Sequence, residues 1–223
     1  MKMLLLAGWI CYLLQSAVFS EQNKYCNALQ EIARSSDGHT LMIACDKVQG
    51  NYQGIFIKSG DKQQFFNWSN SVNKTYAPEI FTDDINHDKV PEIVVVLTKD
   101  HGTGLAIREA HILNSKTFGE IPLVDPVTVV KQRVTSSKNK SGVQVIVDGK
   151  EQHFSTKQID IDQEKWFDHL YFGNIIRFEI KDHMLISRLP GQISPGGFIG
   201  ETVIHYEFQE NLFVPWKVEF NFY

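Results

Sequence analysis

From Thr40 onward the chain alternates apolar and polar residues with a period of two. This period is the signature of β-strands that have one solvent-facing side. The clearest runs, separated by short polar turns, are residues 40–44, 52–57, 143–147, 151–154, 175–180, 184–187, 202–208 and 213–222. Asp148-Gly149 lies between two of them and is typical of a tight hairpin, because that turn needs positive φ at both central residues. The pattern predicts antiparallel strands that follow one another along the chain.

Helical periodicity is scarce by comparison. Asn27–Arg34 and Gln163–Leu170 are predicted as short helices, the second with Asp162 as its N-cap. We therefore expect a mainly β (α+β) fold, with antiparallel sheets that form a sandwich or an open barrel and one or two short helices. No repeat of fixed period is present, and no linker is long enough to divide the chain. Residues 21–223 are predicted to form a single domain.

The amino terminus has the three parts of a secretory signal peptide. A lysine near the start is followed by an apolar centre over residues 4–14 and by a cleavage region with small residues that ends at Ser20. The alternative is an uncleaved anchor, but the polar Gln15 and Ser16 leave the apolar stretch shorter than the roughly 18 residues that span a bilayer. Residues 1–20 are therefore predicted to be a signal peptide. With no transmembrane segment after cleavage, we expect a secreted, extracellular protein or one held at the cell envelope.

Cleavage would remove Cys11 and leave Cys26 and Cys45. An even pair of cysteines in an exported chain favours one disulfide, which would stabilise the fold by about 3 kcal/mol by restricting the unfolded chain. Two free thiols are one alternative. Zinc is the other, and it is less favoured because the chain lacks both a CxxC spacing and a nearby histidine pair.

Composition and charge narrow the class of protein. Of 223 residues, 43% are hydrophobic, which is enough to build a substantial core. The formal net charge of −4 comes from 22 basic and 26 acidic residues. Such a chain lacks the excess of positive charge that attracts the phosphates of nucleic acid, so nucleic acid is not expected as a partner.

One segment between two β runs carries a metal-ligand pattern. Asp84, Asn86 and Asp88 alternate, and Glu92 follows. A tightly wound loop can turn these oxygens inward together with the carbonyl of Val90, and Ca²⁺ takes about 6–8 hard oxygen ligands at flexible geometry. Mg²⁺ demands a stricter octahedron and is the weaker candidate. The alternative is a turn in which the same side chains bond backbone amides and no metal is held.

The spacing Asp-x-Asn-x-Asp-x-x-x-Glu followed by Ile-Val-Val-Val resembles the EF-hand-like calcium loop of the FG-GAP, or integrin-type, propeller repeat. It occurs once, so it does not imply a propeller. The chain also resembles exported Gram-positive bacterial proteins that carry one such loop before a strand with Gly-Thr-Gly, here residues 102–104. The chain departs from the loop pattern at His87 and Lys89, where glycines are usual. At the sixth place a left-handed backbone would cost a non-glycine residue about 1–2 kcal/mol.

A second group of polar residues raises the possibility of catalysis. Glu109 and His111 point to the same face of a predicted strand, and His101 is expected nearby. Such a trio can supply an acid, a base or zinc ligands, so a secreted hydrolase is the alternative function. The sequence contains neither an HExxH motif nor a Gly-x-Ser-x-Gly elbow. The favoured function is a non-enzymatic binding module for a protein or cell-wall component, and an enzyme would instead require the trio to meet in one pocket.

Overall fold

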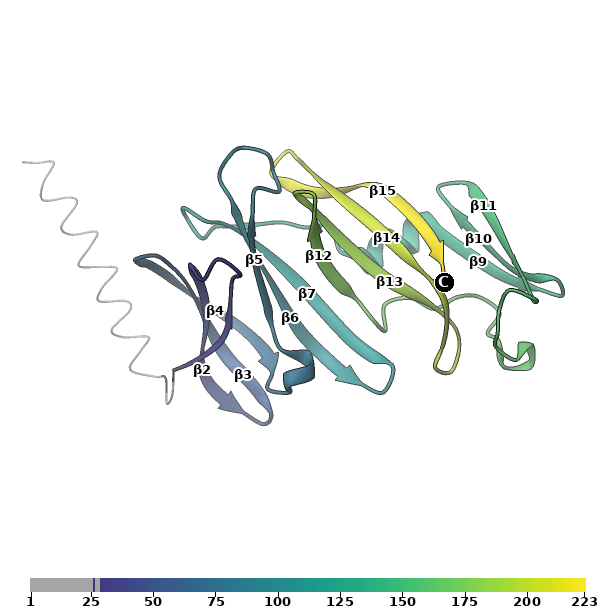
Figure 1. Cartoon of the computed structure of the whole chain (residues 1–223), viewed down its shortest axis with the longest axis horizontal. Coiled ribbons are helices and arrows are strands. Elements are labelled where there is room, and N and C mark those ends of the chain that lie inside the picture. The colour runs from purple at the N-terminus through teal and green to yellow at the C-terminus, as the bar shows by residue number, and fades with distance from the viewer. Residues whose placement is uncertain (1–25, 27–28) are drawn as a thin grey trace, which may run out of the picture.

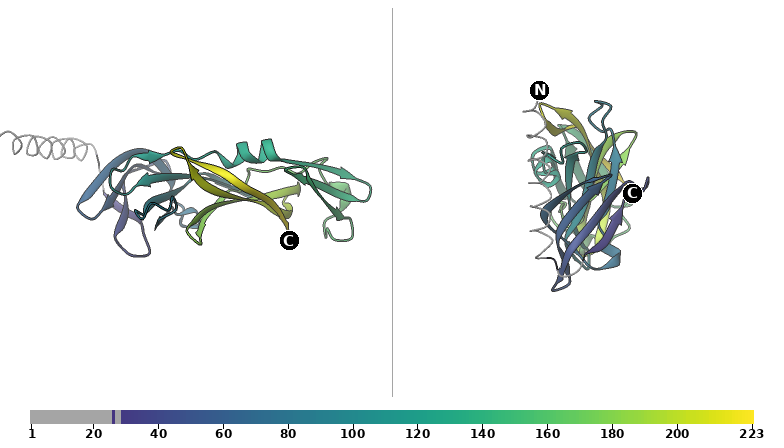
Figure 2. Two further views of the ribbon diagram at one scale, coloured as in Figure 1. Left: turned by 90° about the horizontal axis from the view of Figure 1, so that it is seen from above. Right: turned by 90° about the vertical axis from the view of Figure 1, so that its left-hand side faces the viewer.

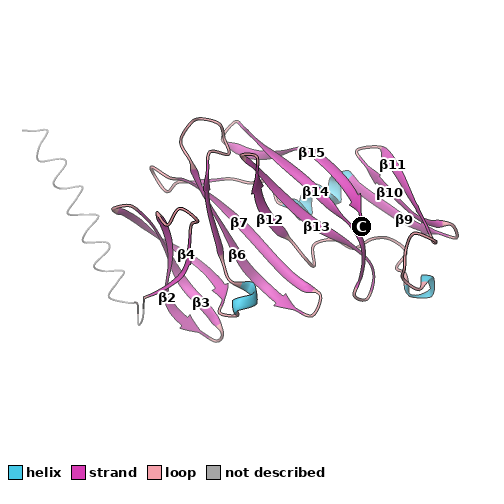
Figure 3. Cartoon of the chain, viewed as in Figure 1, coloured by secondary structure: helices cyan, strands magenta, loops and turns pink. Residues whose placement is uncertain are grey.

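The computed structural model describes Cys26 and residues 29–223, and the predicted signal peptide lies outside the described residues. Strands dominate, as Figure 3 shows, and they form four antiparallel sheets. Sheet A contains β1 (Gln30–Arg34), β2 (Thr40–Val48), β3 (Asn51–Ser59) and β4 (Lys62–Ser71). Sheet B contains β5 (Glu79–Asp83), β6 (Glu92–Gly102), β7 (Leu105–Asn114) and β8 (Glu120–Ile121). Sheet C contains β12 (Arg177–Lys181), β13 (Met184–Ser194), β14 (Gly197–Gln209) and β15 (Leu212–Phe222), and sheet D contains β9 (Val134–Asn139), β10 (Gly142–Val147) and β11 (Lys150–Ser155).

The helical elements are short: the 3₁₀ turns η1 (Lys74–Tyr76) and η2 (Gln163–Lys165), and the helix α2 (Pro126–Arg133). Within each sheet, strands that are consecutive in sequence are also neighbours in space. The expected mainly β fold of antiparallel sheets is confirmed, and the described strands do not close into a barrel. No helix in the described part of the chain is long and apolar enough to cross a bilayer.

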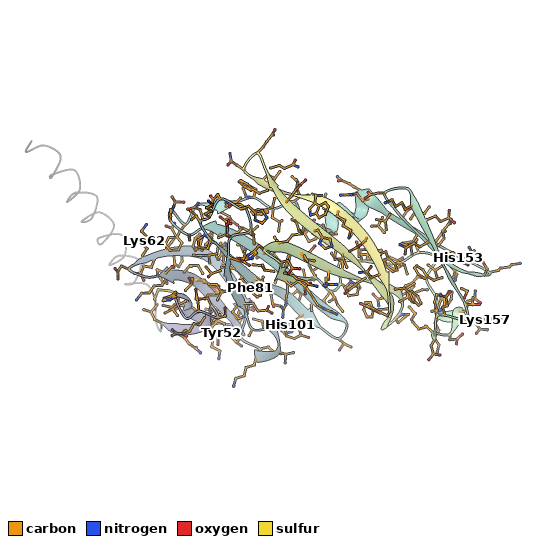
Figure 4. All side chains as sticks on the ribbon, turned by 45° about the horizontal axis from the view of Figure 1, so that its top comes forward. Tyr52, Lys62, Phe81, His101, His153 and Lys157 are labelled. Carbon is orange, nitrogen blue, oxygen red and sulfur yellow. A yellow bond between two sulfur atoms is a disulfide. The ribbon has the colours of Figure 1, made fainter. Side chains whose placement is uncertain are left out.

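The molecule is elongated, with the sheets following one another along its long axis (Figures 1 and 2). Tyr52 and Lys62 of sheet A lie toward one end, and His153 and Lys157 lie at the other (Figure 4). The disulfide between Cys26 and Cys45 is confirmed, with Cα atoms 4.9 Å apart. It ties the chain before β1 to the middle of β2.

Strand β6 of sheet B is buried on both faces over its first seven residues. Ile93, Val95 and Leu97 of β6 belong to a cluster shared with sheet A, whereas Val94 and Val96 belong to a larger cluster shared with sheets C and D. All five side chains are at most 1% exposed. Successive residues of a strand point to opposite faces, so a strand covered on both sides has to be apolar throughout. This packing places β6 between the two clusters, in the middle of the molecule.

The hairpin turns follow the sequence. Asp148 and Gly149 both have positive φ, at 49° and 77°, as the Asp-Gly prediction requires. The turn between β12 and β13 has the same form, with φ of 52° at Asp182 and 58° at His183. Tight turns of this kind set the register of the flanking strands, and so they position the loop residues described below.

The helix predictions need correction. The part of the predicted Asn27–Arg34 helix that the structure describes forms the strand β1, which pairs with β2 from Gln30 opposite Ala44 to Arg34 opposite Leu41. Pairing with an existing sheet edge outweighs a weak helical preference. Of Gln163–Leu170, only the first three residues are helical.

Where helices do form, side-chain caps stabilise their first turns. Asp162 caps η2 as predicted by accepting a hydrogen bond from the Glu164 amide. The helix α2 was not predicted from the sequence. Its start is marked by Asp125, whose side chain accepts from the Thr128 amide, and by Pro126 in the first turn.

Candidate functional site

The candidate calcium loop is the connection between β5 and β6 (Figure 1). Its alternating side chains fold back onto its own backbone. Asp84 accepts hydrogen bonds from the amides of Asp88 and Lys89, each at 3.0 Å. Asn86 accepts from the Asp88 amide at 2.9 Å, and Asp88 accepts from the Val90 amide at 2.7 Å. The structure therefore brings the predicted residues of the loop into one compact turn.

Glu92 lies beneath this turn at the first position of β6. Its side chain is fully buried, and one carboxylate oxygen, Oε2, accepts from the amides of Ile85 and Asn86, both at 3.2 Å. The other oxygen, Oε1, is buried without a hydrogen-bond partner. Burial raises the pKa of Glu92 to about 7. The hydrogen bonds from the backbone amides of Asn86 and Ile85 lower this pKa, whereas the negative charges of Asp88 and Asp84 raise it further.

Two loop residues adopt the conformation that glycine normally provides. His87 and Lys89 have φ of 61° and 69°, in the left-handed region. These are the fourth and sixth places of the loop, where the sequence departs from the glycine-containing pattern. The Lys89 amide still donates to Asp84, so the turn keeps its hydrogen bonding despite backbone strain.

The side-chain oxygens that accept hydrogen bonds from the backbone amides of the loop can still bind a cation. A carboxylate or amide oxygen has two lone pairs, so accepting one hydrogen bond leaves another for a second partner. Among the described residues, no group of three or more His, Cys, Asp and Glu side chains is arranged to hold a metal ion. A bound ion would have to draw the side chains of Asp84, Asn86 and Asp88 inward. Ligation by the Val90 carbonyl stays a prediction.

A residue from sheet C, which the sequence pattern did not indicate, contacts Asp83 directly before the loop. His183, at the turn between β12 and β13, places Nδ1 2.6 Å from Oδ1 of Asp83. The same Asp83 oxygen accepts from the Asp84 amide. The hydrogen bond to Asp83 raises the pKa of His183. The two residues are a hundred positions apart, so no local sequence signal could have revealed the contact.

The three residues of the alternative hydrolase hypothesis (His101, Glu109 and His111) do not assemble in one place. His101 lies near the end of β6, where its Nε2 is 2.7 Å from Oγ of Ser71 and its ring stacks on Tyr76 at 4.3 Å between centroids. In the β6–β7 register His101 is opposite Ala106. Ala106 precedes His111 by five residues, which is about 17 Å along a strand.

Glu109 and His111 do lie together, as their positions on one strand face require. Glu109 Oε1 is 3.4 Å from His111 Nε2, and Glu120 of β8 is 2.6 Å from His111 Nδ1. The imidazole also stacks on Trp68 of sheet A, with ring centroids 4.1 Å apart. Burial opposes protonation of His111, but the two carboxylates beside its ring outweigh it and raise the His111 pKa. Glu109, whose carboxylate lies beside the His111 ring and accepts a hydrogen bond from Lys99, has its pKa lowered to about 2.

These contacts make His111 a link between sheets A and B. A carboxylate whose pKa is about 2 is a poor general base near neutral pH, because it holds no appreciable affinity for a proton there. The arrangement favours an ion-paired structural cluster over the acid and base of a hydrolase.

Comparison with known proteins gave no match to any protein family, curated protein or solved structure. Over its described residues the protein is an elongated array of antiparallel sheets with the Cys26–Cys45 disulfide and an Asp-rich turn set over a buried carboxylate.

Proposed function

We propose that this protein is an exported, non-enzymatic binding module whose β5–β6 loop takes one calcium ion. The observation that carries the calcium site is Glu92. A carboxylate buried beside Asp84 and Asp88, with one oxygen lacking any partner, is an unfavourable arrangement unless a proton or a cation compensates it. A hard divalent cation is bound by carboxylate and amide oxygens of this kind.

The remaining parts of the proposal have separate support. The disulfide is compatible with an oxidising compartment, where such bonds persist, and it agrees with the predicted export signal. The separation of His101 from Glu109 and His111 favours binding over hydrolysis. Extracellular calcium modules work at about 10⁻⁴–10⁻³ M, so strain at His87 and Lys89 is tolerable outside the cell.

Thermal denaturation in chelator and in about 10 mM CaCl₂ tests the calcium site. With a dissociation constant of about 1 mM, that concentration stabilises the folded state by about 1.4 kcal/mol. For a chain of this size the midpoint should rise by about 3–6 °C. MgCl₂ at the same concentration should give a smaller rise, because Mg²⁺ demands stricter geometry.

Asp84→Asn should abolish most of the calcium response, since it removes one negative charge while leaving an oxygen for the loop amides. Asp125→Asn is the matched control, because Asp125 also accepts a backbone amide but lies at the N-terminus of α2. That variant should keep the full response. The proposed calcium site would be refuted if calcium left the denaturation midpoint of the unmodified chain unchanged, or if Asp84→Asn and Asp125→Asn responded equally to calcium.

A further inference from the structure

Among the residues that the structure describes, strand β7 has no neighbouring strand along part of one edge. It pairs with β8 only through Ile112 and Leu113. Pro122, directly after β8, has no N–H to extend the pairing. The chain instead crosses to sheet C, where the Phe213 amide donates to the Pro122 carbonyl at 2.9 Å and the Val124 amide donates to the Phe213 carbonyl at 3.0 Å. In the described structure, residues 107–110 of β7 therefore have no paired strand on the edge that faces away from β6.

The segment leading into β12 forms one backbone bridge to this edge within the described part of the chain. The Ala106 amide donates to the Asn174 carbonyl at 2.8 Å, and the Ile176 amide donates to the Ala106 carbonyl at 3.0 Å. The two chains run parallel at this bridge. Beyond it, no strand pairing joins β7 to β12 among the described residues, although the two strands lie side by side (Figure 1).

Backbone alternation shows which groups are left open. The peptide groups of alternate residues in a strand point to the same edge. Arg108 and Ala110 therefore direct their N–H and C=O groups to the same side as Ala106, away from β6. By the same rule, Phe178 of β12 directs its groups to the side of Ile176. The two open edges face each other.

The space between these edges is accessible. Two hollows of about 480 and 490 Å³ border these strands, and Arg108 and Phe178 line both of them; Ala110 lines the first and Arg177 the second. The open part of β7, residues 107–110, is about 13 Å long at roughly 3.3 Å per residue. We call this space the β7–β12 slot. An extended segment of about four residues fits its length.

The charges around the slot indicate what such a segment should carry. Arg108 pairs with Glu79, and Arg188 pairs with both Glu179 and Glu201. Arg177 is exposed and has no ion-pair partner in the described part of the chain. It lies directly opposite Arg188 in the β12–β13 register, and like charges in this position repel. A carboxylate brought by a ligand would meet Arg177 without displacing an existing pair.

We propose that the β7–β12 slot binds an extended peptide segment of a partner protein, which pairs its main chain with Arg108 and Ala110 and offers a carboxylate to Arg177. This is recognition by strand addition, in which main-chain hydrogen bonds supply affinity and side-chain contacts supply specificity. The proposal rests on the proposed binding role but is independent of calcium in the β5–β6 loop.

Amide hydrogen exchange of the free protein provides the first test. The amides of Arg108 and Ala110 should exchange much faster than those of Ile107 and Glu109, which face β6. Uniform protection along residues 107–110 at low protein concentration would show that the slot is already filled, and would overturn the proposal. Protection that grows with protein concentration would mean that a second copy occupies the slot, which also overturns it.

The second test adds a probe peptide. Capped heptapeptides of alternating threonine and valine, with either aspartate or asparagine at the centre, are titrated in chelator and again in calcium. We expect binding to slow exchange at Arg108 and Ala110, and the aspartate peptide to bind about three- to fivefold more tightly. Arg177→Gln should remove that difference and leave binding of the asparagine peptide unchanged.

A backbone variant separates strand addition from surface adhesion. Ala110→Pro removes an N–H that points into the slot and leaves the β6 ladder intact, whereas Ala110→Ser keeps the N–H as the matched control. Proline should abolish peptide binding and serine should not, with unchanged exchange in β6 for both. Equal binding by the two variants would overturn the proposal. Binding that persists in chelator upholds the slot even if the calcium site fails.

Discussion

Replacing Glu92 by glutamine tests the buried carboxylate directly. Glutamine has nearly the same shape, keeps an oxygen for the amides of Ile85 and Asn86, and does not ionise near neutral pH. In the folded chain the Glu92 pKa is raised from 4.5 to about 7. At about 1.4 kcal/mol for each pH unit, this difference corresponds to roughly 3 kcal/mol.

The sign follows from proton binding. Between pH 4.5 and 7 the folded state holds the Glu92 proton more tightly than the unfolded state does. The free energy of unfolding should therefore fall as pH rises through this window, and the loss should be complete above about pH 7. The glutamine variant lacks this titration, so its advantage over the unmodified chain should be near zero at pH 4.5 and reach about 3 kcal/mol at pH 8.5.

Urea denaturation in chelator across this pH range measures the effect. Glu151→Gln on β11 is the control for the loss of one exposed charge. Calcium at pH 8.5 should raise the free energy of unfolding of the unmodified chain but not that of Glu92→Gln. A difference between Glu92→Gln and the unmodified chain that stays constant with pH would refute the reasoning.

Three further outcomes are expected. Lys89→Gly should raise the free energy of unfolding by about 1 kcal/mol by relieving the left-handed backbone, whereas Lys89→Ala should not; equal midpoints in thermal denaturation would contradict this. His111 has a raised pKa, so its stabilisation is complete below about pH 6.5 and is lost as pH rises through the folded-state value. His111→Gln should remove that loss, and parallel stability curves between pH 5.5 and 8.5 would count against the ion-paired cluster. Replacing Cys26 and Cys45 together by serine should lower the stability by about 3 kcal/mol in urea denaturation, and an unchanged midpoint would exclude a stabilising disulfide.

Much of the strand pattern was predictable because it depends on near neighbours in the chain. The Asp148-Gly149 turn needs only two residues that tolerate positive φ, and its hairpin follows. The short helix α2 was also open to prediction, since Asp125 and Pro126 form a standard start signal. Residues 30–34 were assigned wrongly because their own preference is weak, and the edge of β2 decided their conformation.

For the candidate sites, the sequence by itself determined which oxygens the β5–β6 loop carries and at what spacing, because ligand order within a short turn is a local property. The burial of Glu92 and its perturbed pKa were decided by the tertiary structure, since they depend on what packs over β6. The register of β6 and β7 separated His101 from His111. The open edge of β7 likewise arises from the crossing of the chain at Pro122 and the approach of β12. Burial, register and edge exposure are set by residues far apart in the chain, and only the folded arrangement brings them together.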